Sequence, residues 1–307
     1  MQLYFAVPDT ATTHDGVLVR SFLRQCAVST DLARAVKFRG GGFFADGVPV
    51  LANRRIYPGQ MLSFALPPEG DGVTPQPEIP VNVVYEDAFA VVLEKPPQLA
   101  VHPTLNYPGG TLANGYAAWA AAHGHSPVFR PVNRIDKDTS GLLVVAKDDA
   151  THIGLSRQMA VHSVERAYQT VVYGGFAQDE GFVEANLGRS KTDRKKMAVY
   201  PATEPHTKYA YTGYKVLERL GEFTLLECRL KTGRTHQIRV HMASIHHPVA
   251  GDPVYGPHNC ITSLHGQCLH AKTLGFVHPI TGEQLRFDSE LPDYFTHFLA
   301  TLRRKNT

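Results

Sequence analysis

The sequence has little cysteine, no long hydrophobic run and little net charge, and each shortage excludes a class of protein. Four cysteines occur in 307 residues without a C-x-x-C pair, which argues against a disulfide framework and a four-cysteine zinc site. No uninterrupted apolar run approaches about 18 residues, and the N-terminal segment lacks the basic start of a signal peptide. We therefore expect a soluble, cytoplasmic protein with no membrane partner.

Charge divides unevenly along the chain, although 31 Lys and Arg against 28 Asp and Glu leave a total of only +3. Residues 13–66 carry seven Lys or Arg and three Asp, a net charge of +4, so the rest of the chain is at −1. Affinity for a polyanion grows with the number of phosphates that a protein neutralises. This segment is therefore a candidate phosphate-binding surface, with an ordinary solvated face as the alternative.

A linker divides the chain into two unequal parts. Residues 67–80 carry five prolines, two glycines and three acidic residues but little that could be buried. A length of 307 residues also fits two domains at roughly 100–200 residues each. We therefore expect an N-terminal domain over residues 1–66, with its core at about 13–66, and a second domain over residues 81–307.

The two parts differ in their predicted elements. Upstream, apolar spacing predicts a helix around Leu18–Leu23, a second helix after an N-cap at Thr30, and strands within residues 43–51 and 61–66. Downstream, many strands with few helices and no βαβ repeat predict an α+β domain with a large, mainly antiparallel sheet. The downstream strand candidates are Phe89–Leu93, Leu142–Ala146, Ala167–Tyr173, Tyr209–Leu217 and Phe223–Leu230, and the helix candidates are Leu112–His123, Ala150–His162 and Pro292–Arg304.

A charged turn opens onto an apolar strand within Pro131–Lys147. Side chains of such a turn would lie at the edge of a rigid sheet, where functional loops tend to lie. Asp136 is the candidate carboxylate, with an Asx turn as the alternative role for Asp136 or Asp138. Ser140 lacks the G-x-S-x-G frame of an elbow nucleophile, so we assign the hydroxyls of Thr139 and Ser140 to turn formation.

A second cluster, Leu230–Ala243, carries three Lys or Arg and two His without an acidic residue. Gly233 before Arg234 indicates a strand-to-helix junction, and the first turn of a helix there would favour an anion. The sequence contains neither a P-loop motif nor H-E-x-x-H, so neither P-loop nucleotide binding nor zinc is expected. A histidine-based metallohydrolase is kept as a third alternative, although the 16 histidines of the chain include no H-E-x-x-H motif.

These two clusters, in this order, resemble the motifs of the RluA-type pseudouridine synthases. The residues that carry the resemblance are Asn133-Arg134-Ile135-Asp136-x-x-Thr139-Ser140-Gly141-Leu142-Leu143, Gly233-Arg234-Thr235-His236-Gln237-Ile238-Arg239-Val240-His241 and Gly251-Asp252-Pro253-x-Tyr255-Gly256. Weaker matches include Glu94-Lys95-Pro96, Arg166-Ala167-Tyr168 and Leu269-His270-Ala271. The resemblance covers about residues 81–290, and the basic segment before it is similar to the small S4 RNA-binding module.

The resemblance implies a pseudouridine synthase fold and the isomerisation of uridine in RNA with neither a redox cofactor nor a metal. It implies that Asp136 is the essential carboxylate, acting either as a nucleophile or as a base on the way to a glycal. Arg239 is implied as the cation beside it, and Tyr168 as the tyrosine that stacks on the target base. Where the family has His-Arg-Leu-Asp, this chain begins with Asn133, to which we assign no role in proton transfer.

RNA contacts are expected in the motifs and on two basic surfaces. The motif candidates are Arg134, Arg234, His236 and Gln237. A mobile loop, Gly188–Lys196, with a net charge of +4, is expected to follow RNA phosphates through Arg189, Lys191, Arg194, Lys195 and Lys196. The S4-like domain would contribute Arg20, Arg34, Lys37 and Arg39.

Together these features predict a monomeric enzyme that modifies structured RNA. Large-subunit ribosomal RNA is the expected substrate, and transfer RNA is the alternative. A non-catalytic RNA-binding or ribosome-assembly factor that keeps the same fold is the alternative function.

Overall fold

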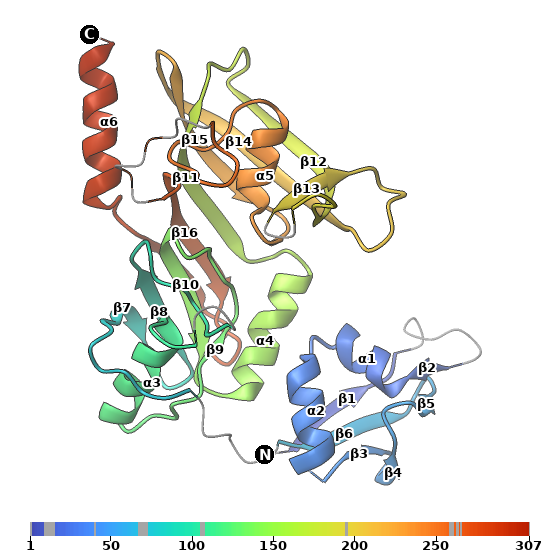
Figure 1. Ribbon diagram of the computed structural model, residues 1–307. Helices are drawn as coiled ribbons and strands as arrows, with labels where there is room; N and C mark the ends of the chain where they lie inside the picture. The colour runs from blue at the N-terminus through green and yellow to red at the C-terminus, as the bar shows by residue number, and fades with distance from the viewer. Residues whose placement is uncertain are drawn as a thin grey trace.

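The computed structural model describes residues 2–8, 16–39, 41–66, 73–104, 108–193, 196–257, 261, 264 and 266–306. Within these residues the chain forms a small N-terminal module and a larger body built on one long sheet (Figure 1). No helix in this part of the chain is long and apolar enough to cross a membrane.

The N-terminal module packs two helices against a four-stranded antiparallel sheet of order β1-β6-β3-β4. Its core is formed by apolar side chains such as Phe22, Leu62 and Phe64. The elements are β1 (Gln2–Ala6), β2 (Val17–Leu18), α1 (Val19–Gln25), α2 (Thr30–Arg39), β3 (Phe43–Ala45), β4 (Val48–Val50), β5 (Arg55–Ile56) and β6 (Met61–Ala65).

Two details of this module differ from the sequence prediction. The cap of α2 is Ser29, whose Oγ accepts the Leu32 amide at 3.0 Å, and Thr30 is already the first helical residue. Strand β1, which was not predicted, pairs with β6 from Gln2 opposite Ala65 to Ala6 opposite Met61. A partner so far along the chain leaves no local turn signal, which is why the pattern at the N-terminus did not indicate a hairpin.

The larger body contains eleven strands in one sheet. The main path runs β13-β12-β14-β15-β11-β16-β10-β8-β7, with β17 beside β16 and β9 beside β10. The strands are β7 (Asn82–Glu86), β8 (Ala90–Lys95), β9 (Arg130–Pro131), β10 (Ser140–Ala146), β11 (Glu165–Tyr173), β12 (Glu180–Arg189), β13 (Met197–Tyr200), β14 (Lys208–Leu220), β15 (Phe223–Leu230), β16 (Leu269–Val277) and β17 (Gln284–Asp288).

Helices cover both faces of this sheet. On one face α3 (Leu112–Ala122) and α5 (Gln237–Ser244) share a core with β8, β10 and β11. On the other face α4 (Asp149–Ala160) packs on β8, β10 and β16, and α6 (Asp293–Lys305) packs on β11 and β15. The predicted α+β architecture with a mainly antiparallel sheet is therefore confirmed.

One parallel pair lies at the centre of the sheet. β10 and β16 run parallel, with Ser140 opposite His270 and Gly141 opposite Ala271. Gly141 has a φ of +110°, and a Cβ there would lie 2.3 Å from the Ala271 carbonyl oxygen, so no other residue fits without a shift of backbone. This close approach fixes where the turn that precedes β10 meets the sheet.

The segment expected to be a mobile basic loop is largely the end of a hairpin. Arg189 is the last residue of β12, and beyond it the Ser190 amide donates to the Lys196 carbonyl at 2.9 Å before β13 begins at Met197. Arg194 and Lys195 lie outside the described residues. The alternation of β12 escaped prediction because its inward residues, such as Val183 and Leu187, are spaced by small or polar ones.

The N-terminal module contacts the larger body through α4 (Figure 1). Ile153 of α4 is buried in the core of the module. Arg157, one turn further on, donates from Nε to the Cys26 carbonyl at 3.3 Å and lies 5.2 Å from the centre of the Phe5 ring. Because α4 directly follows β10, the module is joined to a central strand of the sheet.

Candidate active site

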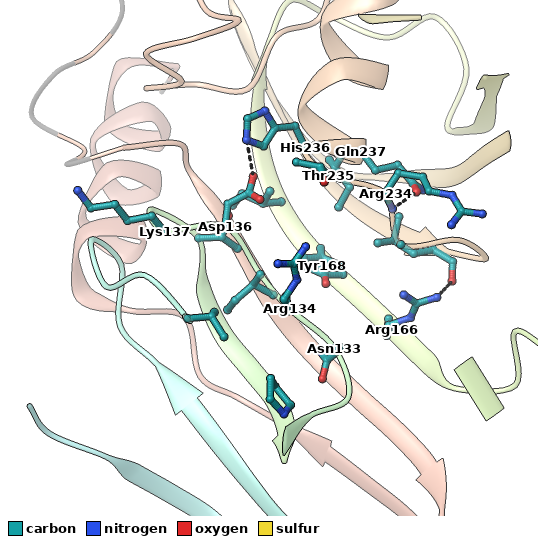
Figure 2. Close-up of a pocket in the computed structure, with 18 of the residues that line it drawn as sticks. Asn133, Arg134, Asp136, Lys137, Arg166, Tyr168, Arg234, Thr235, His236 and Gln237 are labelled. Carbon is teal, nitrogen blue, oxygen red and sulfur yellow. Dashed lines mark hydrogen bonds and ion pairs between the residues drawn. The ribbon is translucent and has the colours of Figure 1, made fainter. Parts of the chain in front are cut away.

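A pocket of about 480 Å³ lies on the face of the sheet that α3 and α5 share. Distant segments form its wall: the loop before α3, the turn before β10, part of β11 and the loop between β15 and α5. Figure 2 shows Asp136 and His236 facing each other within it, with Tyr168 and Arg134 between the two walls. The two motifs found in the sequence therefore line one cavity.

Asp136 lies in the tight turn that leads into β10. The Thr139 amide donates to the Asp136 carbonyl at 3.1 Å, and the buried ammonium of Lys95 donates to the Lys137 carbonyl at 2.8 Å. Asn133 anchors the start of the same turn, because its Oδ1 accepts the Val144 amide at 2.9 Å. The carboxylate is thus presented to the pocket by a rigid turn, and about a quarter of it is exposed.

Arg239 connects Asp136 to a second carboxylate. Its Nη1 donates to Asp136 Oδ2 at 2.8 Å, while Nε and Nη2 donate to Asp252 at 2.7 and 2.9 Å. Burial lowers the pKa of Arg239, but the hydrogen bonds and charge of Asp252 and Asp136 outweigh burial and raise it overall. The guanidinium therefore stays charged and holds Asp136 at the pocket wall.

Tyr168 lies on β11 with its side chain buried beside the pocket. Burial raises the pKa of its phenol; the nearby Arg166 lowers it and Asp136 raises it further. A neutral tyrosine at this position can offer its ring to a base. The structure brings Asp136, Tyr168 and Arg239, the three residues predicted to carry the chemistry, to one cavity.

His236 is the residue before α5 and adopts a left-handed conformation with a φ of +55°. Its Nε2 lies 3.9 Å from Asp136 Oδ2, and its Nδ1 lies 2.9 Å from the Tyr255 hydroxyl. The pKa of His236 is lowered, mainly by burial. Because His236 is left-handed, the helix begins at Gln237 and not at Gly233 as predicted. Ile238, Arg239 and Val240 thus lie on a helix and not on a strand.

Arginines line both the rim and the inner wall of the pocket. Arg134 is exposed, and Arg234 donates from Nε to the Tyr209 carbonyl at 2.9 Å. Arg166, which was not predicted as a site residue, is buried and donates to the carbonyls of Leu230 and Lys231 at 3.4 and 3.3 Å. The positive charge at this rim suits an RNA backbone.

One predicted RNA contact is corrected. Gln237 is buried, and its Oε1 accepts from the Thr232 hydroxyl and the Arg234 amide at 2.8 and 2.9 Å. Its Nε2 donates to the Tyr211 carbonyl and the Thr212 hydroxyl at 2.9 and 3.1 Å. With both ends of the amide used inside the protein, the geometry assigns Gln237 to holding the loop between β15 and α5.

The turn hydroxyls are also corrected. Thr139 Oγ1 accepts from the Gln267 side chain at 3.0 Å, and Ser140 Oγ lies 2.9 Å from His270 Nδ1 and 3.2 Å from the Tyr294 hydroxyl. These hydroxyls therefore join the turn before β10 to β16 and α6, and they do not close the turn itself.

The basic candidates outside the pocket lie on two surfaces. Arg20, Arg34 and Lys37 are exposed on α1 and α2, and the side chain of Arg39 lies outside the described residues. Arg189 is exposed at the end of β12, and Lys196 is half-buried. Lys191 is exposed but pairs with Glu204 at 2.8 Å, so part of its charge is neutralised within the protein.

Four residues of the site were not given a role from the sequence: Lys95, Arg166, Asp252 and Tyr255. Each lies within a quoted motif, but each acts on another protein group, and a sequence motif does not show which group a buried side chain meets. The described residues contain no group of three or more His, Cys, Asp or Glu that could hold a metal ion. A histidine-based metal centre therefore has no site in this part of the chain.

Comparisons with known proteins agree with this geometry. A family model described as RNA pseudouridylate synthase matches residues 90–244. An uncharacterized RNA pseudouridine synthase, YlyB, of Bacillus subtilis is 44% identical over 270 residues, 87% of each chain. The ribosomal large subunit pseudouridine synthase D of Zymomonas mobilis is 46% identical over 226 residues, 70% of each chain. Among solved structures, human RNA pseudouridylate synthase domain containing 4 has a TM-score of 0.59 at 25% identity, over 72% of this chain and 93% of that one.

Proposed function

Since this chain belongs to the RNA pseudouridylate synthase family and is thus an RNA-modifying isomerase, we propose that it acts on large-subunit ribosomal RNA with Asp136 as its one essential carboxylate. Membership confirms the resemblance of its motifs to the RluA-type enzymes. The single observation that supports the choice of Asp136 is its pairing with Arg239 at 2.8 Å in the pocket wall.

The pairing supplies what a catalytic carboxylate needs. A carboxylate in a partly dry pocket loses solvation, and an opposite charge in direct contact offsets that loss. Arg239 is in turn held by Asp252, so it cannot swing away from its position behind Asp136. Asp136 is therefore fixed beside a positive charge, with one side open to the pocket, in a position to act as a nucleophile or as a base.

The isomerisation breaks the bond between N1 of uracil and C1′ of ribose, turns the base and joins C5 to C1′. The hydrogen on C5 leaves as a proton, and N1 gains a proton, so that the product is an isomer of the substrate. The target uridine must first leave its stack, which costs a few kcal/mol and is easiest in loops and bulges. Tyr168 would stack on the displaced base, and Arg134 at the exposed rim would contact the displaced backbone or fill the vacated space. Each step uses side chains that line the same cavity.

The choice of ribosomal RNA rests on the relatives and on the N-terminal module. Several relatives that match most of this chain are named ribosomal large subunit pseudouridine synthase D. The N-terminal module, which we propose is S4-like, presents Arg20, Arg34 and Lys37 on the exposed sides of two helices. Such a surface gives RNA affinity that is independent of the pocket, as a large structured substrate requires.

A tritium-release assay tests the proposal. The full-length chain is incubated with large-subunit ribosomal RNA, and separately with transfer RNA, each carrying tritium at C5 of uridine. We expect release from the ribosomal RNA by the wild type and a loss of at least about 10³-fold in Asp136→Asn. Asp138→Asn, two residues along the same turn, is the matched control and should keep the rate within a few fold.

The outcomes separate the parts of the proposal. Release that survives Asp136→Asn would show that another group performs the chemistry. Release from transfer RNA alone would show that the substrate is wrong while the activity is right. Mapping pseudouridines in total RNA of a deletion strain against its parent would then locate the modified uridines.

A further inference from the structure

Tyr255 is held on three sides next to the catalytic pair. Its amide donates to Asp252 Oδ1 at 3.1 Å, and its ring lies under the Arg239 guanidinium, 5.2 Å from centre to Cζ. Its hydroxyl oxygen accepts the Met197 amide at 2.8 Å. The same hydroxyl also lies 2.9 Å from His236 Nδ1, within hydrogen-bonding distance.

The phenol is the better donor for this hydrogen bond. Burial raises the pKa of Tyr255, although the Met197 amide and Arg239 lower it, so the hydroxyl is protonated at neutral pH. If the hydroxyl donates to Nδ1, the phenol uses both its acceptor and its donor. If Nδ1 carried the proton instead, the hydroxyl oxygen would receive two N–H groups and its own proton would need another acceptor.

The other edge of the imidazole favours the same arrangement. Nε2 of His236 faces Asp136 Oδ2 at 3.9 Å. A proton on Nε2 directs an N–H dipole at the carboxylate, whereas a proton on Nδ1 would direct the Nε2 lone pair at a negative charge. Both neighbours of the ring therefore select one neutral tautomer.

Burial favours the neutral form of the His236 ring, and the backbone conformation holds the ring in place. Burial lowers the pKa of His236; Asp136 and Asp252 raise it, and Arg239 and Arg189 lower it. The backbone of His236 is left-handed, which is uncommon for a residue other than glycine and requires support from its surroundings. This conformation directs the side chain across the pocket toward Asp136, as Figure 2 shows.

We propose that Tyr255 is a positioning residue that fixes His236 as the tautomer protonated on Nε2, so that the pocket offers an N–H donor beside Asp136. The gap of 3.9 Å is longer than a hydrogen bond, which leaves the Nε2 proton available to an acceptor oxygen of the bound nucleotide. This use of the donor rests on the proposed function, whereas the tautomer itself does not.

Nuclear magnetic resonance of the 15N-labelled imidazoles tests the tautomer without RNA. The His236 signals are assigned by their loss in His236→Gln. We expect the proton on Nε2 in the wild type at neutral pH, and a mixture of tautomers or the reverse one in Tyr255→Phe. The control is Tyr85→Phe, which removes a hydroxyl bonded to Asp87 at 2.8 Å, far from the pocket, and should leave the His236 signals unchanged. A wild-type proton on Nδ1, or an unchanged tautomer in Tyr255→Phe, would overturn the proposal.

A double-mutant cycle tests the consequence for activity. Tyr255→Phe should lower kcat about tenfold with little change in KM, because one charge-facing hydrogen bond is weakened. In His236→Gln the amide nitrogen can supply an N–H near the Nε2 position without a tautomer to select, so adding Tyr255→Phe should cost less than about twofold. An equal loss in both backgrounds would mean that Tyr255 acts only through packing, which contradicts the proposal. If the wild type released no tritium, the proposed function would fail while the resonance result still stood.

Discussion

Arg239 lies between two carboxylates that differ in exposure, since Asp252 is fully buried and Asp136 opens on the pocket. The buried carboxylate takes two of the guanidinium's hydrogen bonds and also accepts the amides of Val254 and Tyr255. The exposed carboxylate takes the third hydrogen bond and keeps its second oxygen for other partners. Arg239 therefore orients the carboxylate of Asp136. The paired carboxylate of Asp252 offsets the desolvation of the buried guanidinium.

Lys95 holds the turn that carries Asp136 by a hydrogen bond to the neighbouring Lys137 carbonyl. Its side chain is fully buried, and Nζ donates to the carbonyls of Pro96 and Lys137 at 2.7 and 2.8 Å. Burial lowers the pKa of this ammonium to about 7, although Asp138 and Asp136 raise it. The turn is therefore tied to the end of β8 by a lysine that titrates near neutrality.

This lysine gives a pH-dependent prediction. Because its folded-state pKa of about 7 lies below the usual 10.5, the unfolded chain binds more protons between these pH values, and stability rises with pH. We expect the free energy of unfolding of the wild type, measured relative to Lys95→Met, to rise by about 2 kcal/mol from pH 7 to pH 9.

Urea unfolding at the two pH values measures this difference. The exposed Lys215→Met is the matched control, and its difference from the wild type should stay constant. A difference for Lys95→Met that is flat, or that falls with pH, would contradict a depressed pKa.

Single residues also show what sequence can and cannot reveal about a site. Asp136 and Arg239 are 103 positions apart, and only their family motifs placed them together before the fold was known. Gln237 belongs to the same motif, yet its side chain holds a loop. A motif marks residues that a site needs, but it does not distinguish those that touch substrate from those that support their neighbours.

At the level of elements, prediction succeeded where the pattern is local. The apolar runs of β8 and β10 and the helical spacing of α4 and α6 were found within a few residues of their bounds. β1 and β12 were missed because their own sequences carry no clear strand pattern. They form strands through pairing with β6 and β14. The start of α5 was misplaced because His236 adopts a left-handed conformation, for which no residue preference gave a signal.

Helix α4 has two packing surfaces. Leu155 lies in the core of the large sheet, whereas Ile153 lies in the core of the N-terminal module. A helix shared in this way fixes the orientation of the module relative to the strand that follows Asp136. The exposed arginines of α1 and α2 are thereby kept at a constant distance from the pocket.

Ile153→Asp should release the module. A carboxylate in that apolar core would cost at least about 3 kcal/mol of docking free energy. We expect small-angle X-ray scattering to show a larger radius of gyration, because the module would then lose its contact with α4. Val161→Asp, at an exposed position just after the same helix, is the matched control and should scatter as the wild type does. Identical scattering from both variants would show that Ile153 does not hold the two parts together.

Over the whole molecule, positive charge is gathered at the module and around the pocket while the total stays near neutral. Binding by such a protein should depend on salt through a limited set of phosphate contacts. In the proposed function the module would add affinity for the RNA without touching the reacting uridine. Affinity and chemistry should therefore be separable by mutation.

A triple variant, Arg20→Gln, Arg34→Gln and Lys37→Gln, tests this separation. Each lost phosphate contact should reduce the slope of log affinity against log salt by about 0.7–0.9, a total of about 2–3 for the three. The rate on a short stem-loop at saturation should stay within twofold. The control replaces Lys215, Arg304 and Lys305 with Gln. These three residues are exposed outside both basic surfaces, so the slope should be unchanged. A reduced rate with an unchanged slope would contradict the proposed role of the module.

The general architecture was predictable because most strands of the sheet pair with sequence neighbours. The central arrangement was not, since β16 enters between β10 and β11 from far along the chain. No local pattern specifies such an insertion, and the close contact of Gly141 with Ala271 becomes understandable only once the two strands are adjacent.

The late position of β16 in the chain also sets the order of events during translation. β10 carries Asp136 at its entrance, and β11 and β15 lead to Tyr168 and Arg239, but these two halves meet only across β16. The ribosome delivers both halves before it delivers residues 269–277. A nascent chain therefore contains every group of the proposed chemistry before the strand that joins the two halves of the pocket has been synthesised.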